Sequence, residues 1–258
     1  MQISDEQLKA LLDNRVKLYN QVDFIAADPI IIPHQFSKKQ DIEIAGLFAA
    51  VLAWGNRKSI INSCNKLLTW MDNDPHAFIL HHTEHDLKKM LLFAHRTFNA
   101  TDLLYFIERL HLHYVQYDSL ESMFISPNIE QEADICNALI HFHNAFFSID
   151  HPHRTKKHLA SPAKKSACKR INMYLRWMVR SNAKGVDFGI WKSISSSELY
   201  IPLDVHTGTI ARKLGILKRT QNDWKTNEEL IELLRKFDSI DPAKYDFALF
   251  GLGAFEKF

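Results

Sequence analysis

Glycine is scarce in this sequence, with 8 residues among 258. So few glycines argue against a glycine-rich nucleotide-binding loop and against a β fold built from many tight turns. The three cysteines, Cys64, Cys136 and Cys168, are far apart and odd in number. This pattern excludes a disulfide framework, indicates a reducing compartment and offers too few thiolates for a four-cysteine iron–sulfur cluster. We expect no cluster, no metal and no other cofactor.

Long apolar runs are lacking as well. The most apolar stretch, Ile42–Trp54, contains Glu43 and is too short to cross a bilayer. The first six residues, Met1–Glu6, are polar and acidic, so no signal peptide is expected. Because 46% of the residues are hydrophobic and 24% are charged, the chain can form a packed core, as one large domain or as two lobes around a cleft. We expect a cytoplasmic protein with no membrane partner.

Helical periodicity dominates the sequence. Apolar residues recur at intervals of three and four in most segments, and we predict no strand. We therefore expect an all-α protein. The stretch 41–54 is apolar on nearly all sides, which predicts a central helix. The other helices predicted from periodicity cover residues 8–19, 59–71, 103–110, 129–147 and 166–180.

Three further helices are predicted from the residues at their starts. Asp204 is a favourable N-cap for a helix that ends at Gly215. Thr226 begins a capping-box sequence and predicts the start of a second helix. Asp241, which a proline follows, predicts the N-cap of the last helix.

Acidic residues are lacking between residues 151 and 186, where ten lysines and arginines lie. The rest of the chain carries 22 basic and 30 acidic residues, a net charge of −8. A basic segment on an acidic body is typical of proteins that contact a phosphate backbone, although a solvated basic loop has the same composition. The ten residues are Arg154, Lys156, Lys157, Lys164, Lys165, Lys169, Arg170, Arg176, Arg180 and Lys184.

The segment Tyr200–Gly215, with the sequence YIPLDVHTGTIARKLG, resembles an element of the helix-hairpin-helix DNA glycosylase superfamily. In that superfamily an aspartate begins a helix at a cleft between two helical lobes, and Asp204 matches its position. The whole chain resembles an uncharacterised bacterial branch of the superfamily over roughly residues 15–255. The supporting segments are Asp41–Arg57, Ser166–Arg170, Leu175–Arg180, Val186–Trp191 and Tyr245–Gly253.

The resemblance implies a single all-α unit, residues 1–258, with two helical lobes. One lobe would contain about residues 40–200, including a basic hairpin at 151–180, and the other would contain residues 1–40 and 201–258. The implied function is base-excision repair of duplex DNA, in which a damaged base is flipped out and its N-glycosidic bond is cleaved, with or without lyase cleavage at the abasic site. Such a protein would be a nucleoid-associated monomer.

Asp204 and Lys169 are the candidate catalytic residues. A carboxylate suits Asp204 because cleavage of an N-glycosidic bond builds positive charge on the sugar, although an aspartate at this position caps a helix in any protein. The resemblance matches Lys169, 35 positions earlier, to the lysine that attacks the sugar in the lyase-type members. A lysine becomes a nucleophile when burial or neighbouring cations favour its neutral form. A solvated or phosphate-contacting lysine is the alternative.

Lys164, Lys165 and Arg170 flank Lys169 and are the expected DNA-contacting residues of the hairpin. The hairpin glycines of the superfamily are missing, since residues 161–169 contain none. Those glycines let backbone amides approach a phosphate closely. The three cations are therefore expected to carry more of the phosphate binding here.

Two other segments complete the expected site. The turn after the central helix holds Asn56 and Arg57, where the superfamily carries the turn that fills the gap left by a flipped nucleotide. We expect these two residues, and His206 in the Asp204 element, to face DNA. Aromatic side chains stack on extruded bases, or else pack in the core. The expected base-pocket residues are Phe250, Phe255 and Trp54.

Two other functions are compatible with the residues. Without the hairpin glycines, a chain of this fold is also compatible with a non-catalytic nucleic-acid binding protein. His81 and His85, with Asp86 adjacent, are compatible with an HD-type metal phosphohydrolase. That class needs a second histidine and a distant aspartate in register, and the sequence offers no convincing set.

Overall fold

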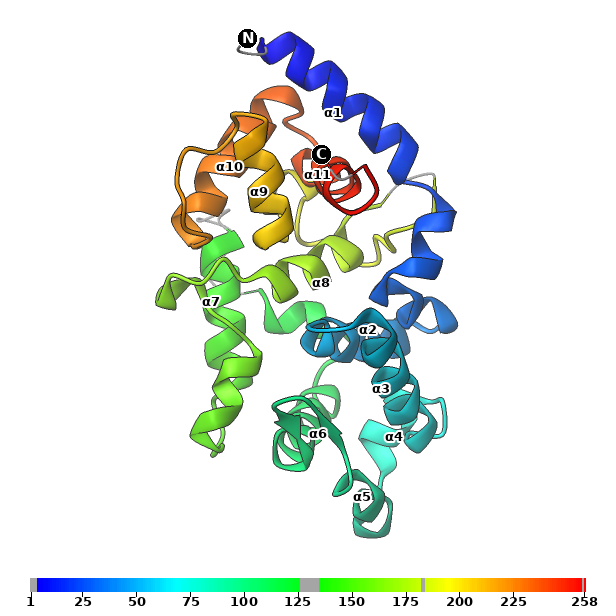
Figure 1. Cartoon of the computed structure of the whole chain (residues 1–258). Helices are drawn as coiled ribbons and strands as arrows, with labels where there is room; N and C mark the ends of the chain where they lie inside the picture. Colours follow the sequence, from blue (N-terminus) through cyan, green and yellow to red (C-terminus); the bar gives the residue numbers. More distant parts are fainter. Residues whose placement is uncertain (1–3, 126–134, 182–183, 257) are drawn as a thin grey trace. The chain divides into compact units, whose positions relative to one another are not determined.

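The computed structural model describes residues 4–125, 135–181, 184–256 and 258. This part of the chain is predominantly helical (Figure 1), which confirms the predicted all-α class. The sheet found in it is small, an antiparallel pair of β1 (Ala94–His95) and β2 (Phe98–Asn99), which the sequence pattern did not predict. Among the helices of the described residues, we find none with the length and apolar character needed to cross a membrane.

The chain divides into two compact units, and each is assembled from separate stretches of sequence. The division expected from the resemblance was at residues 40 and 200, whereas the observed division lies near residues 26 and 160. Unit 1 comprises Met1–Ala26, Ala133–Cys136 and Ser161–Phe258, and unit 2 comprises Ala27–Glu132 and Asn137–Ala160.

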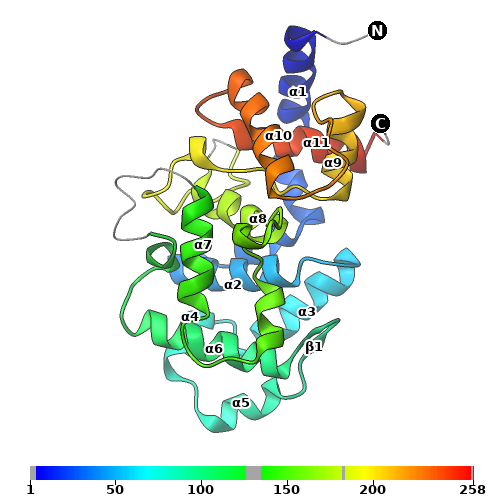
Figure 2. The same cartoon turned by 90° about the vertical axis from the view of Figure 1, so that its left-hand side faces the viewer.

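In unit 1, both α1 and α9 pack against α11 (Figures 1 and 2). Close approach of α1 depends on Gly251, because a Cβ at this position would lie 2.0 Å from the ring of Tyr19. The helix α9 begins after Asp204 and is followed by Gly215 at a φ of 75°, as the sequence predicts. The helices of this unit are α1 (Asp5–Tyr19), α8 (Lys169–Val179), α9 (Val205–Lys213), α10 (Trp224–Phe237) and α11 (Tyr245–Ala254).

In unit 2, α2 (Lys39–Leu52) is buried on nearly all sides, which confirms the central helix predicted there. Its Glu43 side chain is fully buried, and its carboxylate accepts hydrogen bonds from the Tyr114 hydroxyl at 2.8 Å and the Leu120 amide at 3.0 Å. Such bonds offset the cost of removing a carboxylate from water. The other helices are α3 (Arg57–Trp70), α4 (Pro75–His81), α5 (Glu84–Met90), α6 (Ala100–Tyr114) and most of α7 (Ile135–Phe146).

Short 3-10 turns connect the helices, and the polar stretch 151–165 contains two of them. The predicted helix 129–147 lies partly outside the described residues, and its described part is α7. The turns are η1 (Val22–Ala27), η2 (Pro29–Ile31), η3 (Pro33–Gln35), η4 (Leu120–Met123), η6 (His153–His158), η7 (Pro162–Lys164), η8 (Ser196–Glu198) and η9 (Pro242–Lys244).

Two of the three helix starts predicted from capping residues differ from the prediction. The N-cap of α10 is Asp223, which accepts a hydrogen bond from the amide of Thr226, so Thr226 lies inside the helix and is not its cap. The last helix, α11, begins at Tyr245 after a 3-10 turn, and Asp241 makes no side-chain capping bond. The carboxylate of Asp241 is bound by Arg180 instead. A charged partner in the tertiary structure therefore prevails over the local capping preference at this position.

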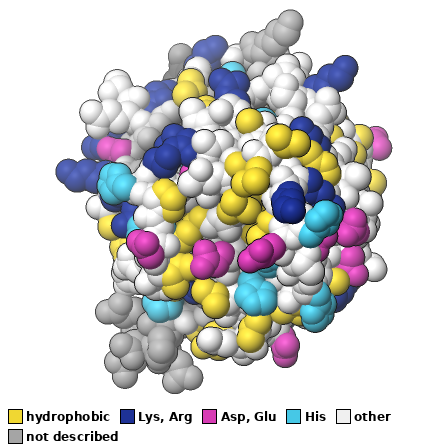
Figure 3. All heavy atoms as spheres, turned by 90° about the horizontal axis from the view of Figure 1, so that it is seen from below, with side chains coloured by type: hydrophobic (Ala, Val, Ile, Leu, Met, Phe, Trp, Pro, Cys, Tyr) yellow, Lys and Arg dark blue, Asp and Glu magenta, His cyan; other side chains and the backbone are white. Residues whose placement is uncertain are grey.

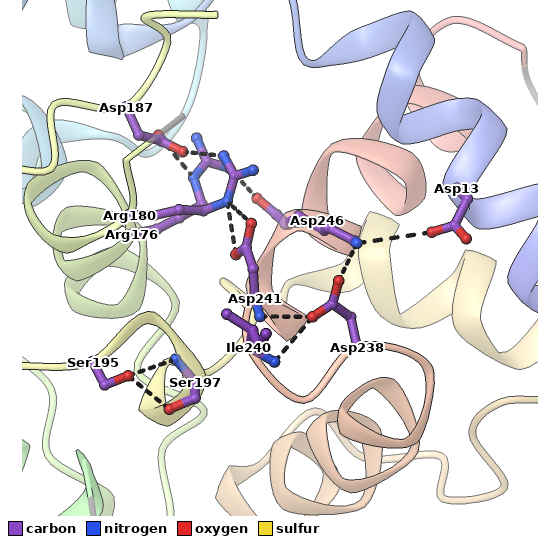
Figure 4. Close-up of polar contacts among 11 residues, drawn as sticks. Asp13, Arg176, Arg180, Asp187, Ser195, Ser197, Asp238, Ile240, Asp241 and Asp246 are labelled. Atoms are coloured by element: carbon purple, nitrogen blue, oxygen red, sulfur yellow. Dashed lines mark hydrogen bonds and ion pairs between the residues drawn. The ribbon is translucent and has the colours of Figure 1, made fainter. Parts of the chain in front are cut away.

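Arg176 of α8 and Arg180, the residue that directly follows this helix, are almost fully buried. Figure 4 shows their contacts with Asp187, Asp241 and Asp246. The Nη1 atom of Arg180 donates to Asp187 at 2.8 Å, and its Nε lies 2.9 Å from both carboxylate oxygens of Asp241. The Nε atom of Arg176 donates to Asp187 at 3.3 Å, and its Nη1 donates to Asp246. Each buried guanidinium thus meets two carboxylates, which is the arrangement that buried charge requires.

The same two guanidinium groups lie near the ring of Phe247, at 4.4 Å for Arg176 and 5.3 Å for Arg180. These cation–π contacts, together with the ion pairs, tie α8 to α11 and to the segments around Asp187 and Asp241. The direction of α8 is therefore determined at its C-terminal half by buried charge.

Replacement of Asp187 by Asn should lower the free energy of unfolding by about 3–5 kcal/mol, because two buried guanidinium groups would lose a shared carboxylate. A matched control is Asp72→Asn, since the Asp72 side chain is 81% exposed and lies 3.9 Å from Lys89. The control should change the stability by less than about 1 kcal/mol. Urea unfolding followed by circular dichroism measures both. Similar losses in the two variants would contradict the importance given to the buried network.

Candidate active site

Asp204 is the N-cap of α9. Its Oδ1 accepts a hydrogen bond from the Thr207 amide at 2.9 Å, and its backbone is extended, as at a typical helix start. The motif that carried the resemblance therefore folds locally as expected. A carboxylate at this position also interacts favourably with the positive end of the helix dipole.

Lys169 is the first residue of α8, and its Nζ lies 3.0 Å from Oδ2 of Asp204. The structure thus brings together the two candidate catalytic residues, both of unit 1, across 35 positions of sequence. The Lys169 side chain is 38% exposed and that of Asp204 is 21% exposed. Both groups can therefore be reached from solvent.

The electrostatic environment favours the ionised form of Asp204. Burial alone would raise the pKa of its carboxyl group, but the Lys169 ammonium and the hydrogen bond from Thr207 together outweigh burial, with a smaller contribution from His206. The pKa consequently lies below the ordinary value of 3.8. At neutral pH the site holds a carboxylate that can stabilise positive charge or accept a proton.

The turn before Lys169 adopts backbone conformations that usually take glycine. Lys165 has a φ of 61° and Cys168 a φ of 52°, both in the left-handed region. Such a conformation costs about 1–2 kcal/mol in a residue with a Cβ. The Lys165 carbonyl accepts a hydrogen bond from the Trp224 amide at 3.1 Å, and the Cys168 amide donates to the Ser166 hydroxyl at 3.2 Å. These bonds hold the turn without the expected glycines.

The predicted DNA-contacting lysines of this turn, Lys164 and Lys165, are exposed. Arg170 is only half-buried, and burial lowers the pKa of its guanidinium. On α9, His206 is exposed next to Val205, whose side chain is 70% exposed although it is apolar. The unit 1 residues predicted to contact DNA therefore differ in their access to solvent, and the two lysines and His206 have the most.

The basic segment offers less free positive charge than its composition suggests. Arg176 and Arg180 are buried in the network with Asp187, and they cannot contact a phosphate. In unit 2, Arg154 pairs with the buried Asp102 at 2.7 Å. All the acids that neutralise these arginines lie outside residues 151–186, although Asp187 follows the segment directly. The segment therefore has an excess of positive charge in the sequence that the folded protein partly neutralises.

Asn56 and Arg57, the other residues predicted to face DNA, are exposed in unit 2, where Asn56 caps α3 through the Ser59 amide at 3.3 Å. Trp54, a predicted base-pocket residue, is half-buried, and the guanidinium of Arg96 lies 4.7 Å from its ring centroid. Arg96 also occupies the space where a Cβ on Gly55 would lie. This turn therefore carries a stacked arginine that sequence spacing did not reveal.

The aromatic residues Phe250 and Phe255, predicted for a base pocket, belong to an aromatic group in unit 1. Phe250 is half-buried and meets Phe24 edge-on at 5.7 Å. Phe255 is 53% exposed and stacks on Tyr19 at 5.4 Å. Phe255 is thus the one of the pair with a ring open to solvent, whereas Phe250 packs mainly inside.

His81 and His85, the pair that suggested a metal phosphohydrolase, lie in unit 2. His81 ends α4 and His85 lies in α5, so the two do not share a helix, and Asp86 caps α5 by binding Thr83. Over the described ranges of the chain, we find no group of three or more His, Cys, Asp or Glu side chains that can hold a metal ion. The face viewed from below α5 carries acidic, basic and histidine side chains interspersed among hydrophobic ones (Figure 3).

The structure thus defines a predominantly helical protein with a lysine–carboxylate pair at the starts of two helices. The chain matches the model of the family described as "Protein of unknown function (DUF2400)" over residues 28–255, and it belongs to this family. Neither a curated protein nor a solved structure matches the chain.

Sequence reasoning missed Asn222, which lies close to the site. Its Nδ2 donates to the Asp204 carbonyl at 3.0 Å, and its Oδ1 accepts from Arg212 at 2.6 Å. Gly208 makes this approach possible, since a Cβ there would lie 2.6 Å from the Asn222 side chain. Gly208 and Arg212 of α9 are visible in the sequence, but neither identifies Asn222 as the partner.

Ionised Asp204 should stabilise the fold, because its pKa is lower in the folded chain than its ordinary value of 3.8. The contribution is complete above pH 3.8 and is lost as the pH falls through the lower folded-state value. Asp204→Asn keeps an oxygen for the Thr207 amide. This variant should be less stable than the unmodified protein at pH 7 and equally stable once Asp204 is protonated, as measured by urea unfolding across pH. If the difference in unfolding free energy between the two proteins is the same in acid as at pH 7, the loss of stability comes from altered packing and not from the charge of Asp204.

Proposed function

We propose that this protein is a DNA N-glycosylase of the helix-hairpin-helix type with abasic-site lyase activity. It would flip a damaged base out of duplex DNA and cleave its N-glycosidic bond. The observation that carries the proposal is the 3.0 Å contact between Lys169 Nζ and Asp204 Oδ2 in a partly exposed site. The resemblance of the Asp204 element to that superfamily supports it.

The two side chains suit the two steps of this chemistry. Departure of the base leaves positive charge on the sugar, and the Asp204 carboxylate would stabilise that charge. As Lys169 attacks the anomeric carbon, a bond from Nζ to carbon forms, the bond to the base breaks, and the base leaves with the bonding electron pair. The proton that Lys169 gives up would pass through the Asp204 carboxylate to the departing base. Transfer of a second proton from Nζ to the ring oxygen, as the bond between that oxygen and the anomeric carbon breaks, then gives a Schiff base, from which the abasic strand is cleaved by elimination.

The proposed activity is tested on duplexes that carry oxidised, alkylated or deaminated bases. Asp204→Asn should lower base release on the order of 10²-fold or more, because the charge-stabilising carboxylate is lost. Lys169→Gln should abolish the adduct trapped by borohydride. Lys236→Gln is the matched control, since Lys236 is exposed near the end of α10. Binding of duplexes without cleavage of any lesion would overturn the enzymatic proposal.

The exposed lysines Lys164 and Lys165 are proposed to contact DNA phosphates. Each phosphate contact releases condensed counterions, so Lys164→Gln with Lys165→Gln should make the slope of log K against log salt concentration less negative by roughly 2. Titration of a fluorescent duplex at several salt concentrations measures the slope. Lys218→Gln with Lys236→Gln serves as control because both are exposed residues of unit 1 outside the turn. An equal change in both double variants would exclude a specific role for the turn.

A second candidate function is non-catalytic nucleic-acid binding. The capping bond from Thr207 to Asp204 at 2.9 Å favours it, because this bond gives the aspartate a structural role without any chemistry. Asp204→Asn separates the two functions, since it keeps the capping bond and removes the charge. Unchanged DNA binding together with absence of cleavage in the unmodified protein would support the binding function.

A further inference from the structure

The segment Asn222–Asn227, which covers the loop end and first turn of α10, contacts the turn that precedes Lys169. The Trp224 amide donates to the Lys165 carbonyl at 3.1 Å. Ser166 and Asp223 form an isolated antiparallel bridge. The start of α10 therefore holds the backbone of the turn at the point where it has its left-handed residues.

The same segment contacts the strand-like stretch that leads to Asp204. Asn222 donates to the Asp204 carbonyl at 3.0 Å, and Arg212 of α9 orients the amide by donating to its Oδ1 at 2.6 Å. The ring of Trp224 stacks on Tyr200, with 4.7 Å between the ring centroids. This short segment thus contacts the residues that precede both candidate catalytic residues in the chain.

Asn227 joins the two stretches with a single side chain. Its Nδ2 donates to the Ile201 carbonyl at 2.8 Å and to the Ala167 carbonyl at 3.4 Å. The side chain is fully buried, and its Oδ1 has no hydrogen-bond partner among the described residues. A buried amide oxygen without a partner costs about 1–3 kcal/mol. An apolar residue would avoid this cost, so packing alone does not account for an asparagine here.

The Lys169–Asp204 pair needs such support because it is partly exposed. Ion pairs between partly exposed side chains contribute about 0–1 kcal/mol, too little to fix a flexible lysine side chain in one position. The positions of the two backbones therefore decide whether the charged groups meet. Along the chain, Lys169 and Asp204 are connected only through the 34 residues between them.

We propose that Asn222 and Asn227 are positioning residues, and that the segment between them is a clamp holding Lys169 and Asp204 in contact. The catalytic meaning of the clamp rests on the proposed glycosylase function. The contact between Lys169 and Asp204 does not depend on that function, because it is present in the protein without DNA.

The clamp is tested by measuring the pKa of the Asp204 carboxyl group with carbon-detected NMR. The charged or polar groups that face this carboxylate are Lys169 from α8 and the Thr207 amide and His206 from α9. Lys169→Gln should raise the Asp204 pKa and sets the upper reference. Asn222→Ala and Asn227→Ala should each raise it part of the way, because a displaced Lys169 no longer lowers it.

A double-variant comparison separates the clamp from a direct effect of Asn222 on Asp204. In the Lys169→Gln background, Asn222→Ala should cause little further rise in the pKa, because the pair through which it acts is gone. Asn99→Ala is the matched control, since Asn99 is a half-buried capping residue of unit 2. Replacement of the fully buried Asn227 can prevent folding. Asn222 is only half-buried, so Asn222→Ala still tests the proposal in that case.

The proposal of a clamp would be overturned if the folded Asn222→Ala protein had an unchanged Asp204 pKa. It would also be overturned if Asn222→Ala raised this pKa equally in the presence of Lys169 and in the Lys169→Gln background. Neither outcome depends on catalysis, so the clamp stands or falls separately from the glycosylase proposal. With a cleavable lesion in hand, Asn222→Ala should lower kcat severalfold and leave the affinity for duplex DNA unchanged. A loss of affinity with unchanged kcat would contradict a positioning role.

Discussion

Neutralisation of the two guanidinium groups buried at the C-terminal end of α8 is the constraint on which the structure of unit 1 depends. Arg176 and Arg180 cannot remain in the interior without carboxylates, and these come from Asp187, seven positions after Arg180, and from Asp241 and Asp246, more than 60 positions further along the chain than the arginines they bind. The requirement therefore joins the segment after α8 and the start of the last helix to one point of the fold. It also directs the opposite end of α8, where Lys169 lies, toward the start of α9.

The geometry of the candidate site depends on strong buried interactions that position the backbone and on one weak, partly exposed ion pair. Buried ion pairs fix the direction of α8, hydrogen bonds from the start of α10 fix the turn before it, and the exposed ends of Lys169 and Asp204 meet as a result. Scarcity of glycine has a local consequence here. Lys165 and Cys168 adopt left-handed backbone conformations that a glycine would take without strain, and neighbouring backbone contacts must compensate.

The sequence predicted elements whose determinants are local. The all-round apolar pattern of residues 41–54 gave a central helix, and Asp204 with Gly215 marked both ends of α9. Capping signals failed where a distant partner competed, as at Asp241, whose carboxylate binds Arg180. The helices α4 and α5 are only seven residues each, too short for periodicity to reveal.

The site was predictable only in part for a related reason. The motif resemblance selected Asp204 and Lys169, but their 3.0 Å contact follows from packing of segments that periodicity cannot bring together. Arg176 and Arg180 counted as surface charge because their carboxylate partners lie outside the acid-free stretch. Asn222 and Asn227 act through backbone carbonyls, and a carbonyl has no signature in the sequence.

The interleaving of the two units determines the order in which the chain can acquire structure during synthesis. The packing partner of α1 is α11, and the start of α11 lies 226 positions after the end of α1. At about 5–20 residues per second, a ribosome needs about 10 to 45 seconds to make that interval. All of unit 2 emerges within it, while the apolar side of α1, with Leu8 and Leu12, stays uncovered. The helix α1 is therefore made before all of unit 2 and is buried only after it.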